Sequence, residues 1–565
     1  MRLQCLVTIL ACSVSIACIA ASEPAPLAYS PLAQTPSSNA VASAAPEATK
    51  AGMAIMEQGG NAFDAAVAVA GALAVVEPYY SGLGGGGFWL MHLGYSETDL
   101  FLDSREVAPA RATANMFLNQ QGDVIKNLSV TGPLAAAIPG EPAGMAYVAN
   151  NFGRLTLARD LAPAITLAKQ GFPVNQRYRD MAEMRLDDLR RSPAAAKVFL
   201  KDNEVPPVGY IVKQPDLANT LTTFAQQGKA GFYDGLVAKQ LVQGVKHAGG
   251  IWEANDLTNY HVLLRRPLTA NYHNMSIVTA PPPSAGGIGL ITMLNILEKF
   301  DMTELTPMQQ IQLTVEAMRR AYFDRTRYLA DPNYVTVPTR RLTSMQHADR
   351  LRETITPRKA TPSKSLGKPE IKITEGQHTT HFSIIDKEGN RAAVTLSLNY
   401  PFGACFMPPG TGVILNDEMD DFSTKPGAPN VYGIVGSHAN EIAPGKRPLS
   451  SMTPTFITTQ TGVGIIGTPG GSRITTMVLL GILDFEKGHL PDSWVKVSRY
   501  HHQYLPDEIQ YEPGTFTDEQ IKQLEAMGYK LHEINRHFGN MQAIYWDRAT
   551  NTVYSASDPR GGLVY

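Results

Sequence analysis

The chain has 565 residues, enough for one large domain or several small ones with a sizeable buried core. Its 49 basic and 51 acidic side chains nearly balance, giving a formal net charge of −2 at pH 7. The sequence contains no basic block of the kind that follows a phosphate backbone, which argues against nucleic acid as a partner.

The first residues are typical of an export signal. Arg2 precedes an apolar run from about Leu6 to Ala21 that ends in small side chains. The run is shorter than the roughly 20 apolar residues that a membrane span needs, so an uncleaved anchor is the less favoured interpretation. We therefore expect residues 1–21 to be a signal peptide and the protein to be exported, either to a periplasm or to the medium.

Cysteine usage agrees with this interpretation. Three of the four cysteines lie in the signal, and only Cys405 is left in the mature chain, which excludes an intrachain disulfide. Cys18 could be a lipid-attachment site because Ile16-Ala17 precede it, although Ser15 fits such a motif poorly; a lipid-anchored form stays open as an alternative. Residues 22–45 are rich in Pro, Ala and Ser, which predicts a flexible lead-in.

The next segment predicts a buried helix and a glycine-rich turn. Asn61 is a plausible helix N-cap with Asp64 at the third helical position, and the helix that follows is rich in Ala and Val on most sides. We expect it to pack against a sheet. The cluster Gly84–Gly87 precedes a predicted strand, Phe88–Met91, and no Gly-Lys-Ser/Thr ends it. This pattern favours close backbone packing over a phosphate-binding loop.

Charged and hydroxyl side chains in the middle of the chain have ordinary explanations when taken alone. Arg105 could be a surface arginine paired with a neighbouring acid, Asp103 or Glu106. The predicted helix 311–329 has opposite charges at helical spacings, which indicates a solvated or salt-bridged face. Ser284 lacks the Gly-x-Ser-x-Gly setting of a hydrolase nucleophile, so we do not assign it that role.

A hairpin with two unlike faces is predicted from Thr379 to Asn399, with its turn at Gly389-Asn390. Side chains alternate between the two faces of a strand. One face of the second strand is apolar: Ala392, Val394, Leu396 and Leu398. The other face has two hydroxyls and an amide: Ala393, Thr395, Ser397 and Asn399.

This segment, TTHFSIIDKEGNRAAVTLSLNYPFG, resembles the signature of the γ-glutamyltranspeptidases (glutathione hydrolases), a branch of the N-terminal-nucleophile hydrolases, and the resemblance extends over nearly the whole mature chain. It implies a four-layer αββα fold of the α+β class. It also implies a heterodimer of two fragments of one precursor, a large one of residues 46–378 and a small catalytic one of residues 379–565, which together form one domain.

In that family the precursor cuts itself before the first Thr of the motif, which here implies cleavage between His378 and Thr379. The Thr379 hydroxyl would then be the nucleophile and its new α-amine the base, because an α-amine titrates near 7.7–8.0 and is partly neutral at working pH. The resemblance further implies that Ser397 assists Thr379. An isolated Thr-Thr pair would instead suggest only the start of an ordinary strand.

The resemblance also implies a pocket for a zwitterionic substrate. Arg105 would bind the α-carboxylate through charge-assisted hydrogen bonds. Glu418 and Asp421 would hold the α-ammonium, and Asn399 would join them. Without the resemblance, the acidic run 415–422 would be interpreted as a solvated loop.

Three further motifs match the family. Ser450 and Ser451 correspond to paired serines that bind the substrate carboxylate. Gly470 and Gly471 correspond to glycines whose backbone N–H groups form the oxyanion hole, although a Pro-Gly-Gly turn alone would be unremarked. Tyr432 corresponds to the tyrosine of a lid loop over the site.

The implied activity is that of a γ-glutamyltransferase and glutathione hydrolase. Thr379 would attack the γ-glutamyl amide of glutathione or a related compound, and water, an amino acid or a dipeptide would take the acyl group. The family commonly has Val at position 392 and Thr at 397, so Ala392 and Ser397 suggest reduced rather than lost activity. Neither a cofactor nor a metal is expected, since no His-Glu-x-x-His pairing occurs.

Two alternatives remain. A related acylase for glutaryl-type amides such as cephalosporin side chains would not need the ammonium site, so Glu418 and Asp421 argue against it. A non-catalytic, unprocessed exported binding protein is the other, and the joint presence of Thr379, Gly470-Gly471 and Arg105 argues against that.

Overall fold

A computed structural model gives the fold for most of the chain. The described residues are 32–367, 379–425, 427–428, 430–431 and 437–561. The predicted signal peptide, Cys18, His378 and Tyr432 lie outside them. None of the helices in this part of the chain is long and apolar enough to span a bilayer.

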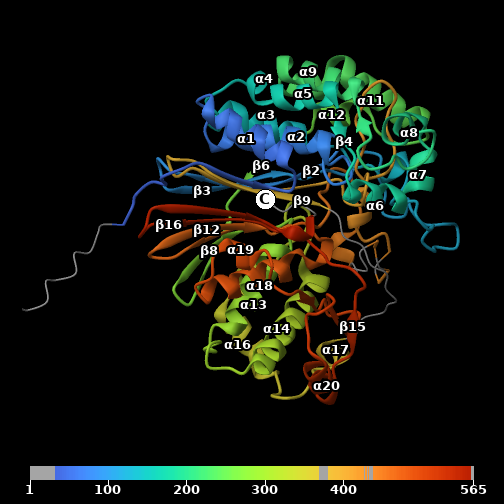
Figure 1. The fold of residues 1–565 in the computed structure, drawn as a ribbon. Coiled ribbons are helices and arrows are strands. Elements are labelled where there is room, and N and C mark those ends of the chain that lie inside the picture. Colours follow the sequence, from blue (N-terminus) through green and yellow to red (C-terminus); the bar gives the residue numbers. More distant parts are fainter. Residues whose placement is uncertain (1–31, 368–378, 426, 429, 432–436, 562–565) are drawn as a thin grey trace, which may run out of the picture.

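Two six-stranded antiparallel sheets are stacked between two layers of helices, which confirms the αββα arrangement (Figure 1). In order across the first sheet, the strands are β1 (Ala40–Ser43), β9 (Thr380–Ile385), β10 (Arg391–Ser397), β2 (Gly86–Leu93), β3 (Thr98–Ser104) and β6 (Leu263–Arg265). In the second sheet they are β17 (Thr552–Ser557), β16 (Gln542–Asp547), β12 (Gly462–Gly467), β11 (Thr455–Thr458), β8 (Met275–Thr279) and β7 (Leu268–Tyr272). Each sheet therefore contains strands from both sides of Thr379.

The helices that cover the first sheet all precede Thr379 in the chain. They are α1 (Pro46–Glu57), α2 (Ala62–Val76), α3 (Glu141–Phe152), α4 (Leu157–Asp160), α5 (Ala162–Gln170), α6 (Gln176–Met184), α7 (Leu186–Arg190), α8 (Pro193–Phe199), α9 (Pro215–Gln227), α10 (Lys229–Tyr233), α11 (Gly235–His247) and α12 (Ala254–Thr258). A two-stranded sheet, β4 (Phe172–Pro173) and β5 (Ile211–Val212), lies among them.

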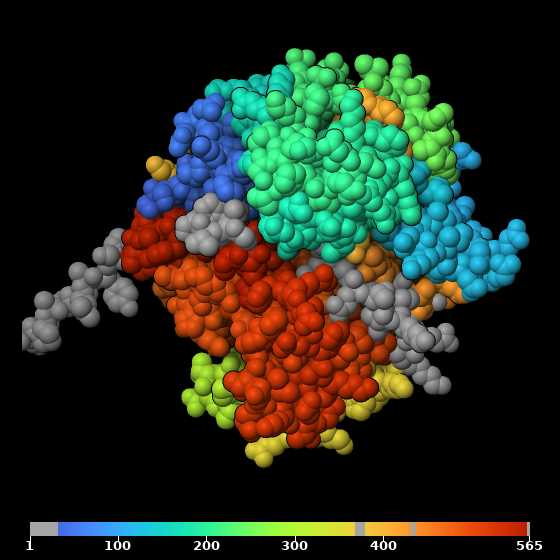
Figure 2. All heavy atoms as spheres, turned by 45° about the vertical axis from the view of Figure 1, so that its right-hand side comes forward, coloured from blue at the N-terminus to red at the C-terminus, as the bar shows by residue number. Residues whose placement is uncertain are grey.

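The helices of the opposite layer come from both sides of Thr379. They are α13 (Gly286–Leu297), α14 (Pro307–Tyr328), α15 (Thr339–Leu342), α16 (Met345–Glu353), α18 (Ile474–Glu486) and α19 (Pro491–Trp494). A small sheet and two helices lie beside this layer: β13 (Tyr500–His501), β14 (Ile509–Tyr511), β15 (Leu531–Glu533), α17 (Ser363–Leu366) and α20 (Asp518–Ala526). Figure 2 shows that the blue-to-green upstream segments and the orange-to-red downstream segments form one continuous body.

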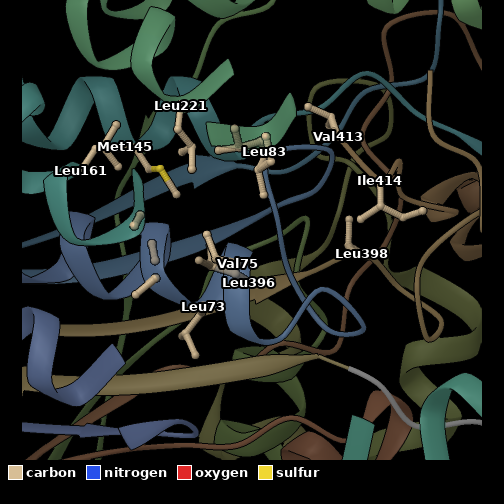
Figure 3. Close-up of a cluster of buried hydrophobic side chains, with 14 of the residues drawn as sticks. Leu73, Val75, Leu83, Met145, Leu161, Leu221, Leu396, Leu398, Val413 and Ile414 are labelled. Carbon is tan, nitrogen blue, oxygen red and sulfur yellow. The ribbon is translucent and has the colours of Figure 1, made fainter. Parts of the chain in front are cut away.

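Helix α2 is the central helix of the first layer, and it forms as the sequence predicts. Asn61 caps it, and a reciprocal capping box with Asp64 satisfies two backbone N–H groups. Every residue of the helix is buried, because Ala and Val cover all its sides. Leu396 on the apolar face of β10 and Leu398 just after this strand belong to the same core cluster (Figure 3).

The polar face of the predicted hairpin lies between the two sheets. His381 Nδ1 is 2.8 Å from Thr395 Oγ1, and Ser383 Oγ donates to the Gln542 carbonyl on β16 of the second sheet. Burial lowers the pKa of His381 to about 3, so this imidazole is neutral at working pH. The two unlike faces of the hairpin thus serve two different layers.

The prediction of a flexible lead-in is wrong for its last residues. Ala40–Ser43 forms strand β1 and pairs antiparallel with β9, with Ser43 opposite Phe382. All four residues are buried. The small side chains of Ala40–Ser43 do not form a pattern that predicts a strand. Strand β1 is instead stabilised by pairing with β9, more than 300 residues away in the chain.

The structure also tests the predictions for the glycine cluster Gly84–Gly87 and for the charged face of α14. A Cβ on Gly85 would lie 2.1 Å from the Ser397 carbonyl oxygen, which confirms close backbone packing in the glycine cluster. On α14, the ion pair of Glu316 with Arg320 is fully buried, so this face is salt-bridged but not solvated.

Candidate active site

A small cavity brings together side chains that are far apart in the sequence. Among the described residues, its lining is Arg105, Thr379, Ser397, Asn399, Asp421, Ser450, Ser451, Met452, Gly471, Ser472 and Ile474. Most of these residues are ones that the sequence had predicted for the site. Two other predicted residues adjoin this lining. Glu418 forms an ion pair with Arg105, and Gly470 is the chain neighbour of Gly471.

Thr379 lies at the entrance to strand β9 and is only 4% exposed. Its Oγ1 is 3.5 Å from Oγ of Ser397, at the end of the neighbouring strand β10. The backbone N–H of Asn399 donates to Ser397 Oγ over 2.8 Å. Because that oxygen already accepts, the Ser397 hydroxyl proton can be directed at Thr379 Oγ1.

The end of helix α2 holds both of these strands, a role that the sequence did not predict. Oγ1 of Thr380 donates to Oε2 of Glu77 over 2.9 Å, and the N–H of Leu398 donates to the Tyr80 carbonyl. Burial raises the pKa of Glu77 to about 7, although the hydrogen bond from Thr380 opposes the shift. Glu77 is therefore the polar contact between α2 and the residue that follows Thr379.

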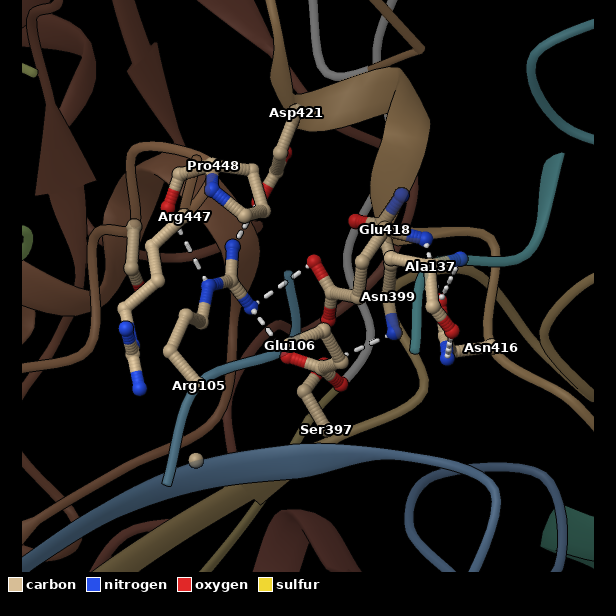
Figure 4. Close-up of polar contacts among 12 residues, drawn as sticks. Arg105, Glu106, Ala137, Ser397, Asn399, Asn416, Glu418, Asp421, Arg447 and Pro448 are labelled. Carbon is tan, nitrogen blue, oxygen red and sulfur yellow. Dashed lines mark hydrogen bonds and ion pairs between the residues drawn. The ribbon is translucent and has the colours of Figure 1, made fainter. Parts of the chain in front are cut away.

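Arg105 follows strand β3 and is buried among three carboxyl groups (Figure 4). Its Nη1 lies 2.7 Å from Glu418 Oε2 and 3.5 Å from Glu106 Oε2. Its Nη2 lies 2.5 Å from Asp421 Oδ2. The interpretation of Arg105 as a surface residue is wrong, because Glu106 pairs with it inside the protein.

These charges do not balance, since one guanidinium faces three acids. Burial raises the pKa of Glu106 to about 7 and raises the pKa of Glu418 well above its usual range. Burial lowers the pKa of Arg105, but the carboxylates of Glu418, Glu106 and Asp421 outweigh that effect and raise it overall. An incoming cation near this cluster would therefore be stabilised.

The acidic residues are held by a neighbour that the sequence analysis did not single out. Asn416 donates to the carbonyls of Gly84 (2.7 Å) and Ala137 (2.8 Å), and its Oδ1 accepts the N–H of Glu418 (Figure 4). These bonds fix the start of a single 3-10 turn, Glu418–Asp421. The only sequence signal was its place next to the acidic run.

Ser450 and Ser451 line the same cavity as Thr379 and Ser397. Ser450 Oγ accepts the N–H of Met452 over 3.1 Å, which leaves the hydroxyl proton for an incoming acceptor. Ser284 Oγ donates to the Met452 carbonyl over 2.6 Å. Ser284 thus supports the loop that carries Ser450 and Ser451.

The Pro-Gly-Gly segment has a backbone conformation that favours glycine, most strongly at Gly470. Gly470 has φ of +143° and Gly471 has φ of +56°. A Cβ on Gly470 would lie 2.4 Å from Cε of Met477. The Ser472 carbonyl accepts a hydrogen bond from the Tyr322 hydroxyl of α14, which fixes the far side of the turn.

The residues before Tyr432 are tied to the acidic turn. The Asn430 amide donates to Asp421 Oδ1 over 3.2 Å, and the Val431 N–H donates to Asp420 Oδ2 over 2.8 Å. Burial raises the pKa of Asp420 to about 7. The lid role of Tyr432 and the cleavage at His378 concern residues outside those described and stay predictions.

Comparisons with known sequences identify the family of the chain. Residues 48–564 match the family described as gamma-glutamyltranspeptidase. A glutathione hydrolase proenzyme from Pseudomonas sp. (strain A14) is 43% identical over 86% of this chain and 85% of that protein. One from Escherichia coli (strain K12) is 39% identical over 92% of this chain and 90% of its own length.

Solved structures with the same fold include an acylase and a gamma-glutamyltranspeptidase. The cephalosporin acylase from Bacillus halodurans superposes with a TM-score of 0.82 at 26% identity, covering 96% of this chain and 98% of that one. A chain of Helicobacter pylori gamma-glutamyltranspeptidase gives 0.56 at 39% identity, covering 57% of this chain and 93% of that one. On its sequence and its fold, the chain belongs to the γ-glutamyltranspeptidase family.

Proposed function

We propose that the protein is an autoprocessed γ-glutamyltransferase and glutathione hydrolase with Thr379 as its nucleophile. The observation that carries this proposal is the cavity itself. In it a buried Thr379 lies beside Ser397, facing both the Arg105–Asp421 ion pair and the Ser450-Ser451 hydroxyls. The names of the relatives at 39–43% identity support the same activity.

Processing would come first. Thr379 Oγ1 attacks the carbonyl carbon of His378, the peptide C–N bond breaks, and the acyl group moves from nitrogen to oxygen. Water then hydrolyses this ester. The large fragment gains a carboxylate at His378, and Thr379 gains a free α-amine that can take its hydroxyl proton in later turnovers.

Acyl transfer would use the same hydroxyl. Thr379 Oγ1 attacks the γ-carbonyl carbon of the donor, its proton passes to the α-amine, and backbone N–H groups of Gly470 and Gly471 stabilise the oxyanion. The α-amine returns the proton to the leaving amine, which is cysteinylglycine when the donor is glutathione. Water, an amino acid or a dipeptide then cleaves the γ-glutamyl ester.

Charge would select the donor. The excess of acid around Arg105 suits an α-ammonium, held by Glu418, Asp421 and Asn399. The α-carboxylate would lie toward Arg105, Ser450 and Ser451. A lid carrying Tyr432 would cover the pocket.

We also infer that residues 1–21 direct export to a periplasm or the medium, with lipid attachment at Cys18 as the alternative fate. Residues 379–565 would then form a heterodimer with the large fragment outside the cytosol.

A pair of chromogenic donors tests the activity. We expect wild-type protein to release the aniline from γ-glutamyl anilide, faster when a dipeptide acceptor is added, and Thr379→Ala to release none. Glutaryl anilide, which lacks only the ammonium, should be a poor donor. Faster cleavage of glutaryl anilide would favour an acylase, the kind of enzyme that the Bacillus halodurans relative is named for. No cleavage of either donor would favour a non-catalytic relative.

A further inference from the structure

A second buried arginine lies behind the serine side of the cavity. Arg325 is on α14, in the helical layer beneath the second sheet, and is only 7% exposed (Figure 1). Its Nη1 donates to the Ser450 carbonyl over 3.1 Å. The same carbonyl accepts the N–H of Ala285 over 2.8 Å, so the position of Ser450 is fixed from two sides.

Arg325 differs from the other buried arginines of its helix. Arg319 and Arg320 each pair with a carboxylate, Asp507 and Glu316 respectively. No ion pair of Arg325 is found among the described residues, and its Nε is buried without a hydrogen-bond partner there. Burying a charge without an ion-pair partner costs folding free energy. An anion bound in the nearby pocket would offset this cost for Arg325.

The charge of Arg325 is within electrostatic reach of the pocket. Burial lowers its pKa, while Asp421 raises it and Arg105 lowers it further. An arginine remains protonated through such a shift. Positive charge therefore stands behind Ser450, close enough to Asp421 and Arg105 to interact with both.

Arg105 alone is poorly placed to supply the positive charge for a carboxylate. Its Nη1 and Nη2 already contact Glu418 and Asp421, and its Nε donates to the Pro448 carbonyl over 3.3 Å. Binding of a substrate carboxylate by Arg105 would have to compete with these acids. The Ser450 hydroxyl, in contrast, keeps its proton available.

We propose that Arg325 is a specificity-determining positioning residue: acting through Ser450, it makes the enzyme require an α-carboxylate on its donor. This rests on the proposed function, because it assigns one end of the γ-glutamyl pocket. The guanidinium does not contact the donor. It orients the Ser450 loop and adds positive potential to that of Arg105, whose own charge is already engaged by Glu418 and Asp421.

The test compares two donors that differ only in the α-carboxylate, γ-glutamyl anilide and 4-aminobutyryl anilide. Arg325→Gln should lower kcat/KM for γ-glutamyl anilide about 10- to 100-fold, mainly through KM, because the Ser450 contact to the α-carboxylate loses the charge and the hydrogen bond that support it. It should change kcat/KM for 4-aminobutyryl anilide less than about threefold. Arg325→Lys, which keeps the charge, should recover much of the preference.

Arg327→Gln is the matched control, since Arg327 lies on the same helix but is exposed; it should leave both donors unchanged. An equal loss on both donors in a folded, processed Arg325→Gln protein would overturn the proposal and leave the proposed function standing. If Arg325→Gln does not fold, Arg325→Lys decides: an equal loss on both donors there also overturns it. Wild-type protein inactive on γ-glutamyl anilide would reject the proposed function and the inference together.

Discussion

At the scale of single residues, the pocket is defined by an imbalance of charge around Arg105. Three carboxyl groups lie within 3.5 Å of its guanidinium nitrogens, and all four side chains are largely buried. Such a cluster is stable only if some acids are neutral or a cation joins them. The substrate ammonium would be that cation.

Asp421→Asn tests this account of the acidic cluster. The substitution keeps the shape but removes the charge that lies 2.5 Å from Arg105. We expect kcat/KM for γ-glutamyl anilide to fall about 10- to 100-fold, because a charge-assisted contact to the ammonium is lost. With glutaryl anilide, which has no ammonium, the change should stay below about threefold. An equal fall on both donors would mean that Asp421 serves only the structure of the site.

The sequence predicted the residue types of this pocket better than their surroundings. Arg105, Asp421 and Thr379 were found from motifs, and they share one cavity. Glu106 was visible only as a possible surface partner of Arg105. Arg325 was visible only as one charge of a helix. Neighbours in the chain are evident from the sequence, whereas burial and contacts between distant segments depend on the tertiary fold.

At the scale of elements, the end of α2 positions the strands that carry Thr379 and Ser397. Glu77 accepts the hydroxyl of Thr380, and the Tyr80 carbonyl accepts the N–H of Leu398. Because α2 is buried on all sides, these contacts are rigidly supported.

Glu77→Gln should make stability less sensitive to pH. The carboxyl has a pKa of about 7 when folded against an ordinary value of 4.5, so the folded state holds its proton better. The free energy of unfolding therefore falls as pH rises from 4.5 through about 7, by up to about 3 kcal/mol from this group. Gln keeps an acceptor for Thr380 and does not titrate.

Urea unfolding between pH 5 and pH 8 measures this effect. The stability difference between Glu77→Gln and wild type should shift in favour of the variant as pH rises. Glu57→Gln, at an exposed acid near the end of α1, is the control and should follow the wild type. Parallel curves for Glu77→Gln and wild type would show that folding does not raise the pKa of Glu77.

Elements were predicted well where their own pattern determines them. The capped, buried α2 and the two-faced hairpin formed as expected. Strand β1 was missed, because four small residues form a strand only through their pairing with β9. The face of α14 was expected at the surface or in a salt bridge, and it lies in a buried salt bridge.

At the scale of the whole molecule, the fold explains how a cut chain could stay intact. Strands β9 and β10 lie in the interior of the first sheet, between β1 and β2. The predicted cleavage site immediately precedes β9. Both sheets and the lower helical layer contain segments from each side of it, so cleavage would leave the shared core unchanged.

The fragments should therefore remain associated after processing. We expect them to co-elute as one species in size-exclusion chromatography under native conditions and to separate only in guanidinium chloride. Backbone pairing of β1 with β9 and of β10 with β2 would have to be broken for them to part. Separate elution in native buffer would show that the cores are not shared as described.

The order of strands in the two sheets could not be predicted from local patterns. The family resemblance implied two stacked sheets, but the placement of β9 between β1 and β10 depends on contacts across more than 300 residues. That placement puts Thr379 beside Ser397, in a cavity lined by segments that precede Thr379 in the chain and segments that follow it.

The most direct measurement is the intact mass and N-terminal sequence of the purified protein, compared with its Thr379→Ala variant. We predict two fragments from the wild type, the smaller one beginning at Thr379, and a single uncut chain from the variant. An uncut wild-type chain, or a variant cut at the same bond, would contradict the assignment of Thr379 as the nucleophile.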